Sequence, residues 1–226
     1  VNARPKVTVI VPAKDEATRI AKVLEAVLKS ELATNVLVVS DGSTDGTGDV
    51  ARAMGATVVE LKTNLGKGGA MSAGVKATDA AVICFIDADL EGLEPRHVDG
   101  IIRPVMEGRC EQCVGIFRGG KASSEFAMRV SPSLSGQRAM RREFFLSIPF
   151  VAEMRFGVEV ALNNAARRKA VRTQRIILDG VSNTHKEQKA GFYKGVAARA
   201  KMYAEIGQAM VKTRNRSPKS WKKPFL

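Results

Sequence analysis

The sequence contains no long hydrophobic run. No apolar stretch approaches the roughly 20 residues that a membrane-spanning helix needs, so we expect no transmembrane helix. A secretory signal would combine a basic start, a long apolar run and a small-residue cleavage site, whereas residues 1–12 have the composition of a β-strand. These two observations predict a cytoplasmic protein.

Cysteine and histidine are also scarce. Three cysteines in 226 residues are too few for a disulfide scaffold, and we expect them to be reduced thiols. Cys110 and Cys113 form one CxxC pair, but a structural zinc site needs about four such ligands. The two histidines are His97, in a predicted exposed helix where we expect no special role, and His185.

The net charge of +13 arises in the second half of the chain. Residues 1–107 carry 12 Lys and Arg against 15 Asp and Glu, and residues 108–226 carry 24 against 8. A basic surface of this kind attracts nucleic acid, an anionic membrane or a phosphorylated substrate. Because the chain has only one Trp, two Tyr and nine Phe and no RNA-binding motif, we expect no nucleic-acid partner.

The first half of the sequence alternates between two periodicities. Short β-branched or continuously apolar runs predict strands, and apolar residues spaced by three and four predict helices. The predicted strands are residues 6–12, 35–39, 57–61 and 80–87, and the predicted helices are residues 20–28, 49–54 and 70–76. This alternation predicts an α/β fold in which a mostly parallel sheet is flanked by helices.

The second half is less regular and includes a loop-rich stretch at residues 118–135. We predict helices at residues 95–107, 141–146, 153–168 and 187–211, and strands at residues 112–117 and 171–178. Residues 212–226 contain six basic residues and no acidic one, and we expect this tail to be mobile or bound to an anionic partner.

Two carboxylates follow the predicted strand at residues 80–87. Asp87 and Asp89 are two residues apart, so in an extended chain they lie on one face, just past the carboxyl end of the sheet. Mg²⁺ and Mn²⁺ prefer such oxygen ligands, with water and substrate phosphates completing the coordination shell. A pair of this kind also occurs by chance as a polar strand end.

Two further motifs follow predicted strands. Asp41 and Gly42 open the segment DGSTDGT, whose small residues allow close approach to a planar base or ribose, or else form a turn with a helix cap. Lys67 lies in the segment GKGG, where amides and a lysine can approach a phosphate at a helix start. The Walker and GxGxxG spacings are absent, which argues against a P-loop NTPase or a dinucleotide enzyme.

In this order and spacing, the segments VTVIVPAKDE, VVSDGSTDGT, LGKGGA and FIDADL closely resemble the donor half of glycosyltransferase family 2, whose members have the Rossmann-like GT-A fold. The resemblance covers about residues 6–92. It implies a metal-dependent transferase that uses a nucleotide-diphosphate sugar, UDP- or GDP-linked, with Mg²⁺ or Mn²⁺. A divalent cation would stabilise the negative charge that develops on the leaving diphosphate.

The resemblance assigns roles to individual residues. It implies that Lys67 meets the diphosphate and that Asp89, with Asp87, binds the metal. The remaining residues implied to contact the nucleotide sugar are Pro12, Ala13, Glu16, Asp41, Gly42 and Ala88.

The second half resembles the glucosyl- and mannosyl-3-phosphoglycerate synthases in the segments SGQRAMRREFF, FGVEVAL and GVSNTHKE. This likeness implies that Glu159 binds sugar hydroxyls, next to Asp89 as the other catalytic residue, and that His185 completes the metal site. The segment SGQRAMRRE also resembles polyprenyl-phosphate glycosyltransferases, so the acceptor is a phosphoacid such as 3-phosphoglycerate or, alternatively, a polyprenyl phosphate. The residues that we expect to bind this acceptor are Arg118, Gly119, Gly120, Lys121, Ser135, Gly136 and Arg138.

The sequence thus predicts one domain in three parts. Residues 1–92 form the donor half, residues 93–211 form a smaller region that binds the acceptor and completes the metal site, and residues 212–226 form the basic tail. With a lipid acceptor, the tail would lie on an anionic surface at the inner face of the membrane. Two properties stay open: the stereochemical course, which is either retention or inversion, and the formation of a homodimer. The identity of a catalytic base also stays open, with Glu125, Glu153 and Glu159 as the candidates.

Overall fold

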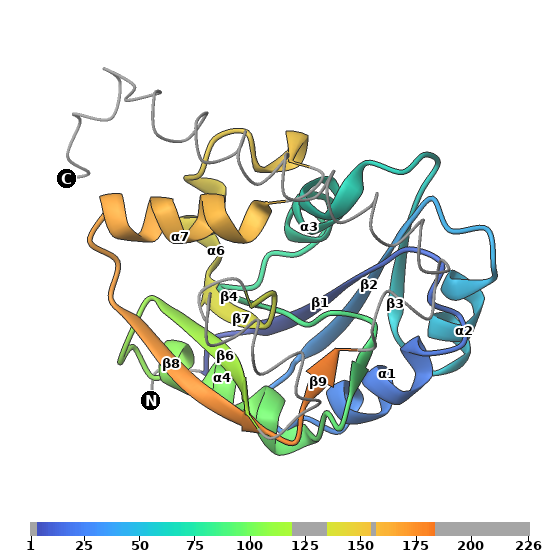
Figure 1. Cartoon of the computed structure of the whole chain (residues 1–226), viewed down its shortest axis with the longest axis horizontal. Coiled ribbons are helices and arrows are strands. Elements are labelled where there is room, and N and C mark those ends of the chain that lie inside the picture. Colours follow the sequence, from blue (N-terminus) through green and yellow to red (C-terminus); the bar gives the residue numbers. More distant parts are fainter. Residues whose placement is uncertain (1–3, 119–134, 155–156, 184–226) are drawn as a thin grey trace.

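A computed structural model describes residues 4–118, 135–154 and 157–183 of the chain (Figure 1). The strands are β1 (Val7–Ala13), β2 (Asn35–Asp41), β3 (Thr57–Leu61), β4 (Val82–Phe85), β5 (Leu90–Glu91), β6 (Gln112–Arg118), β7 (Arg138–Arg141), β8 (Thr173–Asp179) and β9 (Ser182–Asn183). The helices are α1 (Ile20–Leu28), α2 (Thr47–Ala53), α3 (Gly66–Lys76), α4 (Pro95–Met106), α6 (Arg142–Leu146), the 3-10 turn η2 (Val151–Glu153) and α7 (Val158–Arg168).

Seven of these strands form one sheet in the order β3-β2-β1-β4-β7-β6-β8. The pairs β1·β2, β2·β3, β1·β4 and β6·β8 are parallel, and β7 runs antiparallel to both of its neighbours. A short antiparallel pair, β5·β9, lies apart from this sheet. The predicted α/β fold with a mostly parallel sheet is confirmed.

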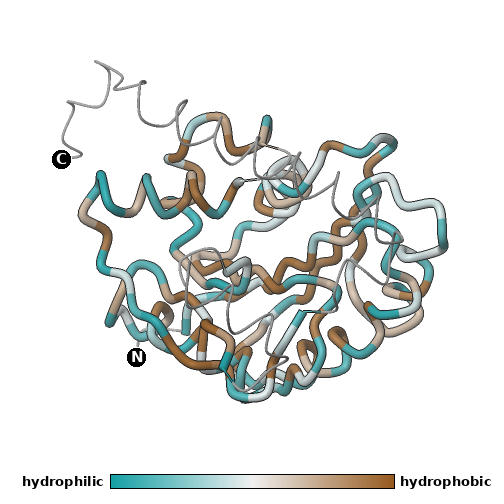
Figure 2. The backbone as a smooth tube through the Cα atoms, in the orientation of Figure 1, coloured by the Kyte–Doolittle hydropathy of each residue, from teal (hydrophilic) through white to brown (hydrophobic). Residues whose placement is uncertain are grey.

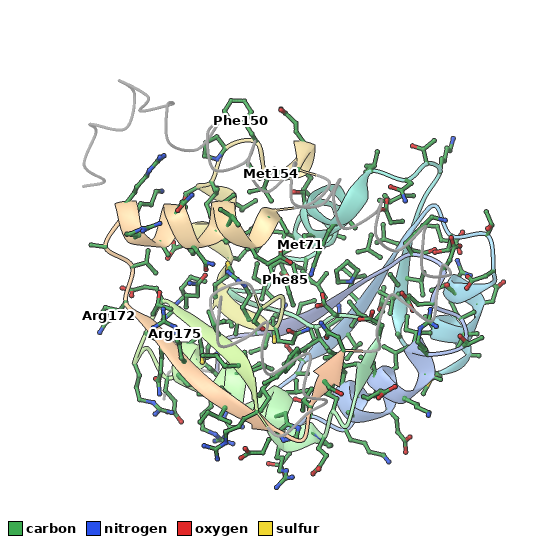
Figure 3. All side chains as sticks on the ribbon, viewed as in Figure 1. Met71, Phe85, Phe150, Met154, Arg172 and Arg175 are labelled. Carbon is green, nitrogen blue, oxygen red and sulfur yellow. The ribbon has the colours of Figure 1, made fainter. Side chains whose placement is uncertain are left out.

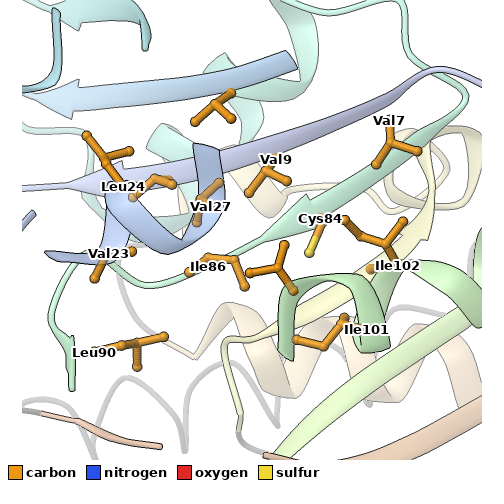
Figure 4. Packing of buried hydrophobic residues seen from close by; sticks show 14 of the residues in the cluster. Val7, Val9, Val23, Leu24, Val27, Cys84, Ile86, Leu90, Ile101 and Ile102 are labelled. Carbon is orange, nitrogen blue, oxygen red and sulfur yellow. The ribbon is translucent and has the colours of Figure 1, made fainter. Parts of the chain in front are cut away.

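Helices cover both faces of the sheet (Figure 1). On one face, α1 and α4 pack on β1 and β4 through residues such as Leu24, Val27 and Ile101, as Figure 4 shows. On the other face, α3 and α7 cover β1, β2 and β4 through residues such as Met71 and Leu162. Because β1 and β4 are buried on both faces, they are almost continuously apolar, and they lie among the most hydrophobic parts of the backbone (Figure 2).

Several sequence predictions differ from the structure in detail. The strand predicted at residues 80–87 is shorter, because only Val82–Phe85 pairs in the ladder. The helix predicted at residues 153–168 begins at Val158. The preceding Gly157 has a φ of 77°, which is outside the helical conformation, so the helix does not extend further toward the N-terminus. Strand β7 was not predicted. The predicted helix at residues 187–211 and the basic tail lie outside the described residues.

His97 is buried, and the prediction that it would be exposed is wrong. Only 7% of its surface is accessible, and its ring accepts a hydrogen bond from the backbone N–H of Glu94 through Nδ1 at 3.1 Å. This bond closes a capping box at the start of α4. Burial and the nearby charge of Arg96 lower the pKa of His97.

Among the described residues, no helix is both long and apolar enough to cross a membrane. The three cysteines are buried and free. Burial raises the pKa of the Cys113 thiol to about 12, so this group stays protonated at neutral pH.

Candidate active site

The motif residues converge at one edge of the sheet. Strands β1, β2 and β4 are parallel, so their carboxyl ends lie together. Ala13 ends β1, Asp41 ends β2, and Asp87 and Asp89 follow β4 by two and four residues. Helix α3 starts at the same edge and supplies Lys67.

Lys67 links two carboxylates that are far apart in the sequence. Its Nζ lies 2.7 Å from Oδ1 of Asp87 and 2.7 Å from Oε1 of Glu159. Glu159 lies in the first turn of α7, where the helix dipole favours negative charge. Burial alone would lower the pKa of the Lys67 ammonium, but attraction to Asp87 and Glu159 outweighs burial and raises it. The site therefore holds a permanent cation between two anions.

Asp41 fixes the start of α3. Its two carboxylate oxygens accept hydrogen bonds from the backbone N–H groups of Leu65 and Gly66, at 2.7 and 2.8 Å. Asp41 is only 4% exposed, so this contact belongs to the interior of the protein. The predicted contact between Asp41 and a nucleotide stays a prediction, and the observed role of this carboxylate is to position the helix that carries Lys67.

The glycines after Lys67 allow a close approach between two segments. The backbone N–H of Gly68 donates to the carbonyl oxygen of Met154 at 2.8 Å, and a Cβ at Gly68 would lie 2.1 Å from the carbonyl oxygen of Val151. Figure 3 shows Met154 next to α3, with Met71 and Phe85 between the helix and the sheet. Gly68 is thus required by packing, and its amide is already used by the protein.

Hydrogen bonds to two aspartate side chains connect the loops after β1 and β2. Asp15, with a φ of 53°, accepts from the N–H of Thr44 at 2.9 Å, and Asp45 accepts from the N–H of Ala17 at 3.0 Å. A hydrogen bond from Lys14 and the bond from Thr44 lower the pKa of Asp15. The spacing of acidic residues in these loops is the only sequence feature that would have indicated the contact.

Glu16 lies between these loops and is largely buried. Its carboxylate pairs with Arg19 at 2.6 Å, and its backbone N–H donates to Thr47 Oγ1 at 2.9 Å. Pro12 and Ala13 are at the end of β1, and Gly42 has a φ of 64° that an L-residue rarely adopts. The residues predicted to contact the base and ribose therefore lie close together along this edge.

The predicted acceptor residues are described only in part. Arg118 ends β6 and pairs with Asp179 at 3.1 Å, with both side chains well exposed. Ser135 and Gly136 lie at the start of the segment that leads into β7. Gly119, Gly120 and Lys121, the predicted metal ligand His185 and the alternative base Glu125 lie outside the described residues.

Arg138 lies in the interior of the protein. The sequence analysis predicted that its side chain contacts the acceptor. It is fully buried, and its guanidinium donates to the carbonyl oxygen of Ser135 and to Oδ1 of Asn163, the latter at 3.1 Å. Burial lowers the pKa of Arg138 to about 10, and Glu159 and Asp87 oppose this effect. Arg138 thus supplies a positive charge from within the protein and supports the loop that contains Ser135.

The carboxylates fit a divalent cation that is shared with a substrate. Asp87 and Asp89 provide the hard oxygen donors that Mg²⁺ and Mn²⁺ prefer. The described part of the chain contains no cluster of three or more His, Cys, Asp or Glu side chains arranged to hold a metal alone.

The fold is of the GT-A type, with its carboxylate pair at the carboxyl edge of the sheet. The model of the family described as "Glycosyl transferase family 2" matches residues 8–167. The chain belongs to glycosyltransferase family 2.

Curated relatives match part of this chain. The 4,4'-diaponeurosporenoate glycosyltransferase of Staphylococcus aureus (strain MRSA252) is 37% identical over 100 residues. These residues make up 42% of this chain and 27% of the relative, so the match spans about a quarter of the relative's length.

Solved structures share the fold over most of the chain. Glucosyl-3-phosphoglycerate synthase from Mycobacterium tuberculosis, in complex with Mn²⁺, UDP-glucose and phosphoglyceric acid, has a TM-score of 0.74 at 23% identity, covering 95% of this chain and 82% of that one. The enzyme from the same organism in complex with Mg²⁺ and UDP has a TM-score of 0.73 at 22% identity, covering 95% and 81%. At these identities the likeness establishes the fold.

Proposed function

We propose that this chain transfers a hexose from a nucleotide-diphosphate sugar to a phosphorylated acceptor, with Mg²⁺ or Mn²⁺ as cofactor. The observation that carries the proposal is the group formed by Lys67, Asp87 and Glu159, with contacts of 2.7 Å, next to Asp89 at the carboxyl edge of the sheet. A cation and several carboxylates at this edge are suited to a ligand with a diphosphate and hydroxyl groups.

On the donor side, each group has a chemical task. Asp87 and Asp89 would hold the divalent cation, which neutralises charge on the leaving diphosphate when it is bound. Lys67 would exchange part of its contact with the carboxylates for a phosphate oxygen, and Glu159 would then accept hydrogen bonds from sugar hydroxyls. The ends of β1 and β2 and the loops after them, with Pro12, Ala13, Glu16, Asp41 and Gly42, would bind the base and ribose. Residues 1–92 supply most of this donor half.

UDP is the first nucleotide to test. The structural neighbours named above hold UDP or UDP-glucose together with Mn²⁺ or Mg²⁺. Their fold matches this chain over the whole donor half, which supports the same nucleotide class here without fixing the sugar.

The acceptor side favours a phosphate-bearing molecule. Ser135 and Gly136 lie next to Asp87, and residues 108–226 carry 24 Lys and Arg against 8 Asp and Glu. A phosphoacid such as 3-phosphoglycerate would gain charged hydrogen bonds from this region. A polyprenyl phosphate is the alternative acceptor, because it presents the same phosphate chemistry.

Ligand binding tests the donor assignment. Binding to the native state raises apparent stability, so UDP- or GDP-sugars with Mn²⁺ should raise the melting temperature of the protein, and chelation should remove this shift. The Asp89→Asn variant should fold but lose the Mn²⁺-dependent shift. If no nucleotide sugar changes the melting temperature in the presence of Mn²⁺, the donor assignment is wrong.

Product analysis then separates the two acceptors. With the best donor, mass spectrometry of reactions containing 3-phosphoglycerate or a polyprenyl phosphate identifies the product. Deletion of residues 212–226 should leave transfer to 3-phosphoglycerate unchanged if that is the acceptor. If a polyprenyl phosphate is the acceptor, the deletion should reduce both transfer and sedimentation with anionic liposomes.

A further inference from the structure

Gln137 is a fully buried amide in contact with the carboxylate site. It lies in the segment just before β7, and none of its surface is accessible. Its Nε2 donates to Oδ2 of Asp87 at 2.8 Å, and its Oε1 accepts from the hydroxyl of Ser135 at 2.8 Å. Both polar ends of the side chain are therefore satisfied, as burial of an amide requires.

The chemistry of these partners fixes the direction of the chain of bonds. A carboxylate only accepts, so the nitrogen of the Gln137 amide must face Asp87 and its oxygen must face Ser135. The Ser135 hydroxyl is itself buried and accepts from the backbone N–H of Gln137 at 3.3 Å. The hydroxyl, the amide and the carboxylate thus form one ordered series from Ser135 to Asp87.

The two oxygens of Asp87 consequently have different partners. Oδ2 contacts the interior amide of Gln137, and Oδ1 contacts Lys67 at 2.7 Å. Gly136 makes this arrangement possible, because a Cβ there would lie 2.6 Å from both Asp87 Oδ2 and Lys67 Nζ. The backbone of Gly136 therefore passes directly beside the ion pair, and only hydrogen fits on its α-carbon.

We propose that Gln137 is a positioning residue: it holds Oδ2 of Asp87 so that Oδ1 is presented to the ligands of the site, and through Ser135 it connects this orientation to the acceptor side. This inference rests on the proposed function for its ligands, but the orientation of Asp87 is a property of the protein alone. A carboxylate with a fixed orientation binds a ligand without losing side-chain freedom at that step.

A second buried glutamine shows what an amide without such a role looks like. Gln112 starts β6, pairs with β7 in the same sheet and is 1% exposed. Its Nε2 donates to Thr173 Oγ1 at 3.3 Å, and its Oε1 has no hydrogen-bond partner among the described residues. Within the described part of the chain, no hydrogen bond joins the Gln112 side chain to Asp87 or Lys67, so Gln112 provides a matched control for a buried amide in the same sheet.

The test compares Gln137→Met with Gln112→Met, since methionine has nearly the volume of glutamine but no donor. A charged hydrogen bond is worth about one to two orders of magnitude in binding, so we expect Gln137→Met to weaken the affinity for UDP with Mn²⁺ at least about ten-fold, by calorimetry. Crystal structures of the unliganded variants should show the Asp87 side chain displaced in Gln137→Met and unchanged in Gln112→Met.

Ser135→Ala is a milder variant for the case in which Gln137→Met does not fold. It removes only the hydroxyl that holds the Gln137 oxygen, and we expect a loss of affinity between that of the wild type and that of Gln137→Met. An unchanged Asp87 orientation in Gln137→Met, or in Ser135→Ala if only that variant folds, would overturn the proposal. If the wild type binds neither UDP nor Mn²⁺, the proposed function fails, and the Asp87 orientation still decides the role of Gln137.

Discussion

Replacement of Lys67 by Met should destabilise the protein by an amount that the ion-pair geometry predicts. Each of the two contacts, at 2.7 Å, corresponds to about 6 kcal/mol of Coulomb attraction at an effective dielectric constant of about 20, so the two together correspond to about 12 kcal/mol. Most of this is cancelled by the desolvation of the charges. Removal of one partner from a buried pair typically costs about 3–5 kcal/mol.

The lower end of this range applies to Lys67. The three side chains retain exposures of 26% for Lys67, 19% for Asp87 and 14% for Glu159. The buried Arg138 also attracts both carboxylates, which offsets part of the loss of Lys67. We therefore expect a loss of about 3 kcal/mol, or about 6–12 °C in melting temperature for a chain of this size. Thermal unfolding followed by circular dichroism at pH 7.5 measures it.

Metal binding gives an independent check. Mn²⁺ at pH 7.5 should reduce the stability deficit of the variant, because it replaces the missing positive charge.

A surface ion pair serves as the control for Lys67. Lys29 lies 3.0 Å from Glu25, with both side chains more than 60% exposed, and Lys29→Met should cost less than about 0.5 kcal/mol. If Lys67→Met costs no more than Lys29→Met and Mn²⁺ does not change its stability relative to the wild type, then Lys67 does not neutralise the site in the way the structure indicates.

Three further predictions concern other parts of the molecule. Gly136→Ala should lower the melting temperature, and it should weaken the affinity for UDP with Mn²⁺ at least about ten-fold. The reason is that its methyl group would meet Asp87 Oδ2 and Lys67 Nζ at 2.6 Å; unaltered calorimetric binding would contradict this. The lowered folded-state pKa of His97 means that wild-type stability is complete above the unfolded pKa of about 6.5 and falls on acidification, and His97→Gln should flatten the stability profile between pH 7 and pH 5 in chemical denaturation. Asp89→Asn should retain the wild-type melting temperature within about 2 °C without ligand and lose Mn²⁺-dependent UDP binding; retention of that binding in calorimetry would remove Asp89 from the metal site.

The first half of the fold was predictable because its elements have simple periodicities. Strand β1 is buried on both faces and α1 on one face, so continuous and three-to-four patterns appear directly in the sequence. Strand β7 was missed because it has only four residues, two of them arginine, and its place between β4 and β6 depends on contacts distant in sequence. Local patterns carry no information on such pairing.

The site was predictable to a similar extent. The sequence placed Lys67 and Asp87 at the same edge of the sheet, and the structure shows them in contact. It did not indicate Gln137, because a glutamine between a glycine and an arginine has no distinctive pattern, and only the packing of β7 against β4 brings its amide to Asp87. Arg138 was expected to contact an acceptor because it lies in the basic second half of the chain, in the segment SGQRAMRRE that resembles enzymes with phosphorylated acceptors. Its burial depends on tertiary contacts with Ser135 and Asn163, which this local pattern does not indicate.

The position of β4 between β1 and β7 limits how this protein can be divided. A fragment ending near residue 92 would keep β1, β2 and β3 but leave one side of β4, a run of valine, isoleucine, cysteine and phenylalanine, without a hydrogen-bonding neighbour. Exposed apolar edges of this kind recruit other chains and aggregate. Attempts to express or recombine the first half as an independent module should therefore retain residues through at least Arg141, so that the edge is covered.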